Sequence, residues 1–492
     1  MSRERKFGER RAALRRLART AREWVAEIWS YDSGKAGLVM LIIFVFLAFY
    51  ALAVIPPNYM YIWNNPKYWQ DHPILAPPQW VRDLGYQRAL HKAVLFHRPS
   101  FRTFSEGFKV HVYRMSYRLD VDDYPQNLVI RISELVAPQV GGQAAPIMVV
   151  LKVRRPDGVE ITVYVDTLTP RRGEKVMFVE SPYMVSMDRN RVVSEVAAKV
   201  IKKPGVELNP QIANEYLFGK FRLEPQGEIT VTPLKGLYTV TLELRYPAEV
   251  KVENPAKEVK LVVVGNCFGF MGTDLVGRDL AQGLLYGFPI ALLIGFVTSL
   301  ASRLIGLFTG VISGYYGGVV DEILQRVIDV MGNIPLLPFL ILVVSISPVE
   351  WRLWIIVFVL IVFGWGGLAI VIRSMTLSIK EEPYIEAARS VGASNARILF
   401  RHVIPQVIPY TIASLVFSVP AAILAEAGLS VIGLEHGWPT WGKILAAARR
   451  AQRYDVWWWI IPPGILLALT SLTFVLLGMA MERIVEPRLR RA

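Results

Sequence analysis

The chain of 492 residues has a single cysteine, no Asn-x-Ser/Thr glycosylation sequon and fewer acidic than basic side chains. One cysteine, Cys267, excludes an internal disulfide framework. Only 20% of the residues are charged, whereas 53% are hydrophobic and the mean hydropathy is +0.35, which excludes an ordinary soluble protein. The shortage of acids leaves a formal charge of +14. The basic residues cluster beside long apolar runs, which favours membrane orientation over nucleic-acid binding.

Residues 1–35 are rich in arginine and carry an apolar stripe at spacings of three and four. This pattern predicts a basic amphipathic helix on the cytoplasmic face of a membrane, with Trp24 and Trp29 at headgroup depth. A disordered basic arm is the alternative. A cleavable signal peptide is not expected, because the basic region is too long and the apolar run behind it is of spanning length. The stripe consists of Leu14, Leu17, Ala21, Trp24 and Ile28.

Six apolar runs predict six transmembrane helices, because each reaches or exceeds the roughly 20 residues that cross a hydrocarbon core. The first run forms a domain of its own at 36–57 and stops at Pro56-Pro57. The other five belong to a C-terminal domain at 271–492. The predicted spans are 36–55, 288–314, 323–346, 353–372, 409–434 and 457–481.

The topology follows from the basic residues near the spans. The N-terminal region carries about ten lysines and arginines, and the C-terminus carries Arg483, Arg488, Arg490 and Arg491, so both ends are expected in the cytoplasm. An even number of crossings is then required, which six spans satisfy. One segment opposes this assignment, because it places four basic residues in an outside loop: Lys443, Arg449, Arg450 and Arg453.

Residues 58–270 differ in composition from the rest of the chain. Segments such as "PIMVVLKVRRPDGVEITVYVDTL" alternate apolar and polar residues and are separated by turn signals, which predicts a β-rich, sandwich-like domain. Helical patches are expected near 192–202 and 210–218. A proline-rich lead, "NNPKYWQDHPILAPPQWV", predicts a semi-rigid stalk. The domain is expected outside the cell, because the first span enters from the cytoplasm.

A short charged stretch, 383–406, separates the fourth and fifth apolar runs. Pro383 after two glutamates suits a first helical turn, Gly392 permits a sharp turn, and Ser394 can cap a second helix that runs to Pro405. Small residues at the corner would let another protein approach closely. An ordinary connector between spans is the alternative.

This stretch resembles the EAA motif of ABC-importer permeases, with Glu386, Ala387, Ala388, Gly392 and Pro405 at matching positions. His402 and Ile404 depart from the general pattern, which has Ile and Leu there. The segments "GTDLVGRDLAQGLLYG", "SGYYGGVVDEILQRVIDV", "EAGLSVIGL", "PTWGKIL" and "EPRLR" are similar to the peptide/nickel branch, and specifically to its DppC/OppC-like permease subunit. The resemblance covers about 30–57 and 270–492. It does not cover the β-rich insert.

The resemblance implies a type I ABC importer permease fold of six transmembrane helices, with a coupling loop at 381–405 that docks on an ATPase. The implied partners are a second permease, two ATPase subunits, an extracytoplasmic binding protein and the lipid bilayer, with no nucleic acid. ATP and magnesium would bind the ATPases, and no cofactor is expected on this chain. Peptides are the implied substrate, although relatives of this branch also carry nickel, haem or oligosaccharides. The implied coupling residues are Glu386, Ala387, Ala388, Gly392, Ala393 and Pro405.

Two further groups of polar residues are candidates for function. Arg303 and Glu426 lie inside apolar runs, where a charge costs roughly 2.5–3.5 kcal/mol and therefore usually faces protein or water. Snorkelling is the alternative for Arg303, and packing or gating is favoured for Glu426. An outer-mouth motif precedes the second span, with structural ion pairing as the alternative to substrate contact: Gly272, Thr273, Asp274, Gly277, Arg278 and Asp279.

The sequence shows no catalytic set and no metal site. "GWPTWGKI" imitates a phosphate-binding loop, but Ile444 stands where that loop needs a serine or threonine. His91 and His97 are six residues apart, not the four of a helical zinc pair. A non-enzymatic membrane component is therefore expected. The rival classes are a membrane-anchored receptor that uses the β-rich domain and an ion-driven transporter, which would need no ATPase.

Overall fold

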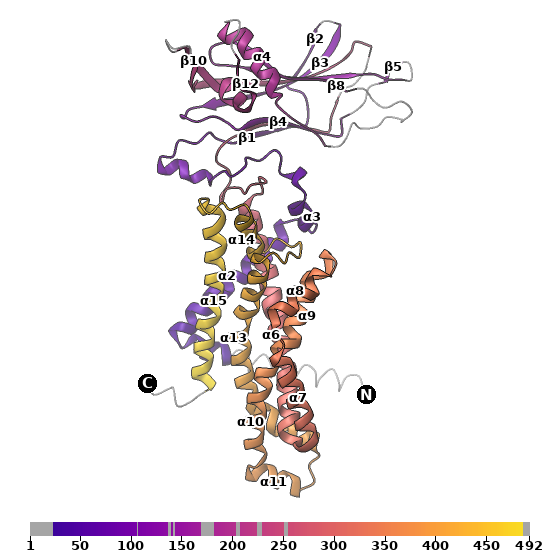
Figure 1. The fold of residues 1–492 in the computed structure, drawn as a ribbon, viewed down its shortest axis with the longest axis vertical. Helices are drawn as coiled ribbons and strands as arrows, with labels where there is room; N and C mark the ends of the chain where they lie inside the picture. The colour runs from indigo at the N-terminus through magenta and orange to yellow at the C-terminus, as the bar shows by residue number, and fades with distance from the viewer. Residues whose placement is uncertain are drawn as a thin grey trace, which may run out of the picture. The chain divides into compact units, whose positions relative to one another are not determined.

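The computed structural model describes residues 23–485 except 106, 136–138, 141–142, 169–181, 203–206, 224–228 and 250–253. The chain divides into two compact units (Figure 1). The helical unit comprises Met1–Asn64 and Gln282–Ala492, and the β-rich unit comprises Asn65–Ala281. Residues 23–29 are helical, whereas most of the predicted amphipathic helix and the "EPRLR" segment lie outside the described residues.

The helical unit contains five helices long and apolar enough to cross a membrane among the described residues, or six if a bent pair counts as one span. They cover the predicted first, second, fourth, fifth and sixth spans. Their elements are α2 (Asp32–Val54), α6 (Leu280–Tyr316), α9 (Val349–Gly364) joined to α10 (Gly366–Lys380), α13 (Ile404–Val431) and α15 (Trp457–Val485). The shorter elements are α3 (Tyr59–Asn64), α7 (Gly318–Asn333), α8 (Leu336–Ser345), α11 (Pro383–Ser390), α12 (Asn395–Ile398) and α14 (Trp441–Arg450).

The predicted third span, 323–346, counts as one crossing only as a broken helix. It is the bent pair α7 and α8, whose axes differ by 76°. Pro335 causes the break, because a proline disfavours helical backbone at the residue before it. Ile334 is accordingly extended, with φ −78° and ψ 121°.

A row of glycines brings α6 close to α10. Gly306, Gly310 and Gly314 recur every fourth residue and so share one face of α6. A Cβ at Gly310 would lie 2.5 Å from the carbonyl oxygen of Ala369, and one at Gly314 would lie 2.6 Å from that of Arg373. This spacing is the small-residue pattern that packs membrane helices tightly.

The β-rich unit is built from antiparallel sheets, as the alternation predicts. One sheet has the order β1-β13-β4-β9: Lys92–Phe96, Glu258–Val264, Asn127–Ser133 and Tyr183–Ser186. The other has the order β2-β3-β12-β7-β8: Phe101–Ser105, Phe108–Leu119, Gly236–Pro247, Ile147–Arg154 and Glu160–Leu168. Two small hairpins pair β10 (Gly219–Leu223) with β11 (Ile229–Pro233), and β5 (Gln139–Val140) with β6 (Gln143–Ala144).

The two large sheets share one apolar core. Alternate residues of β12, from Tyr238 to Tyr246, are buried, and the same cluster includes Ile130 of β4 and Leu261 of β13. The two predicted helical patches are also present. Their elements are α4 (Arg189–Val196) with a π turn at Ala197–Ile201, and a 3₁₀ turn at Pro210–Ile212 with α5 (Ala213–Phe218).

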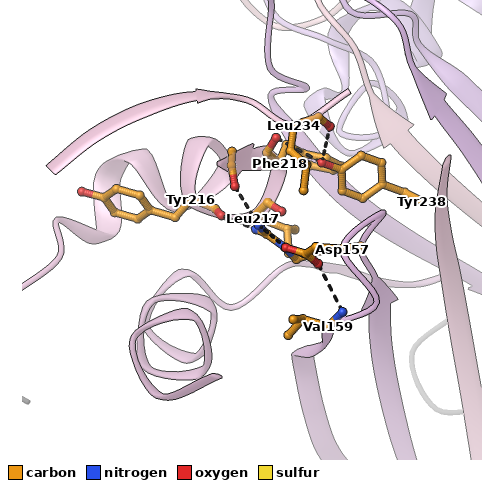
Figure 2. A network of polar contacts seen from close by, with 9 residues as sticks. Asp157, Val159, Tyr216, Leu217, Phe218, Leu234 and Tyr238 are labelled. Carbon is orange, nitrogen blue, oxygen red and sulfur yellow. Dashed lines mark hydrogen bonds and ion pairs between the residues drawn. The ribbon is translucent and has the colours of Figure 1, made fainter. Parts of the chain in front are cut away.

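Arg155, which is 2% exposed, ties α5 to the turn after β7. Its guanidinium donates to the carbonyl oxygens of Tyr216 and Leu217 at 2.9 and 3.0 Å and forms an ion pair with Asp157. Figure 2 shows how Asp157, Tyr216 and Leu217 converge in this network. The last carbonyls of a helix have no partner within it, so this arginine supplies one. The arginine therefore serves the fold of the β-rich unit.

From Asn65 on, the proline-rich lead, predicted as a semi-rigid stalk, belongs to the β-rich unit and is fixed to its strands β13 and β4 through Asp71. Asp71 is 1% exposed, pairs with Lys260 of β13 at 2.5 Å and lies 4.0 Å from Arg131 of β4. Burial raises the pKa of the Asp71 carboxyl, but the hydrogen bond and charge of Lys260, with the charges of His72 and Arg131, hold its pKa below the ordinary value. The sequence pattern missed this because it shows proline content but not the ion pairs formed across the fold.

Candidate functional site

The stretch 383–406 forms the predicted helix–glycine–helix corner. Helix α11 begins at Pro383, and Gly392 has a φ of +82°, in the left-handed region that favours glycine. The Ser394 hydroxyl caps α12 by accepting a hydrogen bond from the amide of Arg397 at 3.4 Å. The turn thus has a conformation that a residue with a Cβ adopts only at a cost.

The corner is anchored to the helical unit through one apolar face. Ile385, Ile398 and Val403 are fully buried in a cluster that also contains Tyr315 of α6 and Ile372 of α10. The Tyr315 hydroxyl donates to the side-chain oxygen of Asn395 at 3.0 Å. Movement of the corner would therefore be transmitted to α6 and α10 through packed side chains.

The opposite face of the corner is exposed. Glu386, Ala387 and Gly392 are on the surface, Ala388 and Ala393 are half-buried, and Val391 at the tip is 84% exposed. A Cβ built on Gly392 would meet no atom within 4 Å. The surface combines small residues, one apolar tip and an acid, which suits the close approach of another protein.

The second helix of the corner does not end at Pro405, contrary to prediction. A π turn at Leu399–Val403 leads directly into α13, so that helical backbone continues from α12 into the fifth span. The wide turn is closed by the amide of Ile404 bonding to the carbonyl oxygen of Leu399. A π turn interrupts the regular i to i−4 hydrogen bonds of the helix. Pro405 has no N–H to donate, and it is tolerated just after this interruption, so the helix continues past it.

The outer-mouth motif forms a closed turn within the β-rich unit. Asp274 is 1% exposed, and its carboxylate accepts hydrogen bonds from the amides of Val276 and Arg278 and from the Arg278 guanidinium, at 2.9, 3.0 and 2.5 Å. Asp279 accepts from the amide of Ala281 at 2.9 Å. These contacts hold the turn together and favour structural ion pairing over substrate contact.

The remaining residues of the motif also serve the turn. The Thr273 hydroxyl donates to the carbonyl oxygen of Pro73 at 2.7 Å and accepts from the amide of Ala76 at 3.0 Å. Gly272 and Gly277 have φ values of +74° and +86°. The motif thus fixes the proline-rich lead to the segment before α6.

Glu426 lies in a buried polar cluster at the end of α13. Its Oε1 accepts hydrogen bonds from Ser430 at 2.8 Å, from Thr440 at 2.8 Å and from the Nε2 of His436 at 2.7 Å. His436 is 0% exposed, and its Nδ1 accepts from the amide of Trp438 at 3.3 Å. These roles fit a neutral imidazole protonated on Nε2. Sequence reasoning missed all three partners. Ser430 is four residues after Glu426 on the same helix, a spacing that could have found it, whereas His436 and Thr440 reach Glu426 only because the loop after α13 folds back onto the helix.

The basic segment that opposes the predicted topology is mostly structured. Lys443, on α14, is 4% exposed and donates to the carbonyl oxygen of Gly437 at 2.9 Å and to the side chain of Asn64 at 2.5 Å. Arg453 pairs with Asp455 at 2.7 Å. Lys443 is held inside the fold and therefore carries less weight as a signal of a cytoplasmic loop, whereas the Arg453–Asp455 pair is exposed.

Arg303, on α6, borders a cavity of about 230 Å³ inside the helical unit. Its Nη1 donates to the carbonyl oxygen of Gly364 at 3.3 Å. The cavity is lined by residues of α6, α8, α9 and α13, among them Ser299 and Ser418. The buried Nε and the bond to Gly364 favour contact with protein over simple snorkelling, although the Arg303 side chain as a whole is half-buried.

The sequence is similar to membrane components of transport systems. Residues 306–491 match the family described as "Binding-protein-dependent transport system inner membrane component". The dipeptide transport system permease protein DppC of Bacillus subtilis is 34% identical over 225 residues, which are 45% of this chain and 69% of that protein. The oligopeptide transport system permease protein OppC of Haemophilus influenzae is 33% identical over 223 residues, which are 45% of this chain and 71% of that protein.

Solved structures with some similarity include the MetNI methionine ABC transporter in inward-facing conformations, with a TM-score of 0.32, 19% identity and coverage of 42% of this chain and 96% of that one. An amino acid ABC transporter has a TM-score of 0.30, 21% identity and coverage of 43% and 93%. The match to the family model begins at residue 306, so the β-rich unit lies outside it.

Proposed function

The chain belongs to the family of dipeptide and oligopeptide transport permeases, and we propose from this premise that it forms half of the translocation pathway of an ATP-driven peptide importer. The observation that carries the proposal is the exposed corner at Gly392, with its rigid backing on α6 and α10. An ion-driven transporter does not bind an ATPase and would not need such a docking surface. A receptor would not need a docking surface that is packed directly against the transmembrane helices.

An importer needs a cytoplasmic surface that binds ATPases and an outer surface that receives the substrate, and the proposed partners follow from these two needs. Two ATPase subunits would bind ATP and magnesium, and one of them would receive the corner formed by α11, Gly392 and α12. A second permease would complete the pathway, and an extracytoplasmic binding protein would deliver the substrate. Glu386, on the exposed face of α11, would meet a basic group of the ATPase.

The ends of the chain are proposed to lie in the cytoplasm. Arg483, in the last turn of α15, lies over the ring of Tyr31, just before α2, at 5.7 Å. A Cβ on Gly37 would lie 2.8 Å from the side chain of Leu477, so α2 and α15 are in contact. The start of the first span and the end of the last therefore share one side, which requires an even number of crossings. Six result if the bent pair α7–α8 counts as one.

The experiment that tests this function is ATP-dependent uptake. The complete transporter, assembled with its permease partner, ATPases and binding protein, is reconstituted in proteoliposomes. We expect accumulation of labelled di- and oligopeptides that requires both ATP and the binding protein. Uptake that is driven by an ion gradient without ATP, or accumulation of an oligosaccharide, nickel or haem but no peptide, would contradict the proposal. Failure to assemble with any ATPase would favour the receptor.

The β-rich unit is proposed to hold or guide the binding protein outside the cell. Residues 90–264 can be replaced by a short glycine–serine linker, because the amide of Asn266 bonds to the carbonyl oxygen of Ala89 at 2.8 Å and the cut ends lie side by side. We expect the shortened chain to retain its ATPases but to lose binding-protein association and most uptake. Pull-down and transport assays measure both. Unchanged association and uptake would show that this unit serves another purpose.

A further inference from the structure

The cavity beside Arg303 is formed by two helix faces of small and hydroxylated residues. On α6, Thr298, Ser299, Ser302 and Arg303 fall within two successive turns and line one side. On α13, Ser418 and Ala422 are four residues apart and line the other. Small side chains at these positions leave open the space that larger ones would fill.

Arg303 brings an uncompensated charge to this space. Its Nε is buried without a hydrogen-bond partner among the described residues, and no acidic residue is among those that line the cavity. A charge inside a membrane span is costly unless protein or water compensates it. The bond to the carbonyl of Gly364, the one found in the described part of the chain, uses only part of the donor capacity of a guanidinium, which has five N–H groups.

Two hydroxyl groups at the same cavity are also hydrogen-bond donors without an acceptor among the described residues. The Oγ1 of Thr298 and the Oγ of Ser299 are buried, and neither has a hydrogen-bond partner among the described residues. Thr298 is 5% exposed and Ser299 is 1% exposed. Buried polar groups in native proteins are normally paired, so three unpaired groups at one cavity indicate a ligand that accepts hydrogen bonds.

We propose that this cavity binds the carboxylate of a peptide, its C-terminal group, as the peptide passes through the membrane; this inference rests on the proposed function. A carboxylate accepts about four hydrogen bonds and pairs well with a guanidinium. A nickel cation would be repelled by Arg303 and would find no carboxylate, thiolate or imidazole ligand in the lining, and a neutral sugar would leave the charge unpaired. A volume of about 230 Å³ is below the range of whole-ligand pockets, so the cavity admits a chain end and not an entire peptide.

The first test measures the electrostatic potential of the cavity without any peptide. The native cysteine is removed by Cys267→Ala, and Ser418→Cys places one thiol in the lining. The purified complex is then labelled with an anionic sulfonatoethyl and a cationic trimethylammonium-ethyl thiosulfonate reagent. We expect the anionic reagent to be favoured, and Arg303→Gln to lower the anion-to-cation rate ratio roughly tenfold or more, because a unit charge a few ångströms away dominates the local potential.

Matched variants separate charge from structure. Arg303→Lys keeps the charge and should keep the labelling preference. Arg326→Gln makes the same substitution at an exposed position of α7 and should leave the ratio unchanged. An unchanged ratio in Arg303→Gln, or a thiol that reacts with neither reagent in the wild-type background, overturns the inference whether or not the protein carries peptides.

The second test is transport. In proteoliposomes, Arg303→Gln should take up a peptide with a free C-terminal carboxylate about tenfold more slowly than wild type, as expected for loss of a charge-assisted hydrogen bond. Uptake of the C-terminal amide of the same peptide, relative to wild type, should fall much less. Equal losses for the two peptides overturn the carboxylate site and leave the proposed function standing. A wild-type complex that imports no peptide overturns both.

Discussion

Gly392→Leu is expected to assemble with the partner permease yet to bind the ATPases weakly or to let them hydrolyse ATP without import. The backbone there has a φ of +82°, which costs a non-glycine residue roughly 1–3 kcal/mol. Within this chain the new side chain meets open space, so the added volume falls wholly on the docking surface. Overpacking a fitted contact costs typically 1–3 kcal/mol more. The purified complex is scored for ATPase retention, ATP hydrolysis and peptide uptake.

Control variants divide this effect into its two causes. Gly392→Asn tolerates the left-handed backbone better than leucine, so it reports mainly on added volume. Gly85→Leu introduces the same strain in the β-rich unit, at a φ of +90° with open space around it, and should leave coupling intact. Glu386→Lys should reduce coupling by reversing an exposed charge at the contact, and Glu386→Gln should do so less. If Gly392→Leu and Glu386→Lys both behave like wild type in all three assays, the proposed coupling role is contradicted and the corner is an ordinary connector between two spans.

Glu426→Ala is expected to destabilise the helical unit strongly. The substitution leaves the Nε2 of His436 and the hydroxyls of Ser430 and Thr440 buried without their acceptor. Each buried donor that is left without its acceptor costs roughly 1–3 kcal/mol, so three such donors make the loss large. We expect a large fall in the midpoint of thermal unfolding of the detergent-solubilised complex and poor recovery of assembled protein.

A double substitution distinguishes this account from simple loss of side-chain volume. Glu426→Ala with His436→Phe removes an acceptor and a donor together, so its cost should be well below the sum of the two single costs. Glu350→Ala removes an exposed glutamate from α9 and should have little effect. Strictly additive costs in the double variant would contradict the proposed coupling between Glu426 and His436.

Local features of the chain were predictable wherever one short segment carries the whole signal. The first span, the corner at Gly392 and the capping serine at 394 each depend on neighbouring residues, so the pattern was sufficient. The alternation that predicts the sheets is likewise local. The glycine row at Gly306, Gly310 and Gly314 was equally visible in the sequence, but its meaning depends on which helix packs against it.

The sequence by itself determined the membrane class, the β-rich insert and the family, because hydrophobic length, side-chain alternation and motif spacing are properties of the linear chain. Tertiary structure alone decided which groups meet. The loop after α13 returns His436 and Thr440 to Glu426, and α13 closes the cavity beside Arg303. Spacing along a helix fixes the face of a residue, but its partner is fixed by the packing of other helices, which no local pattern records.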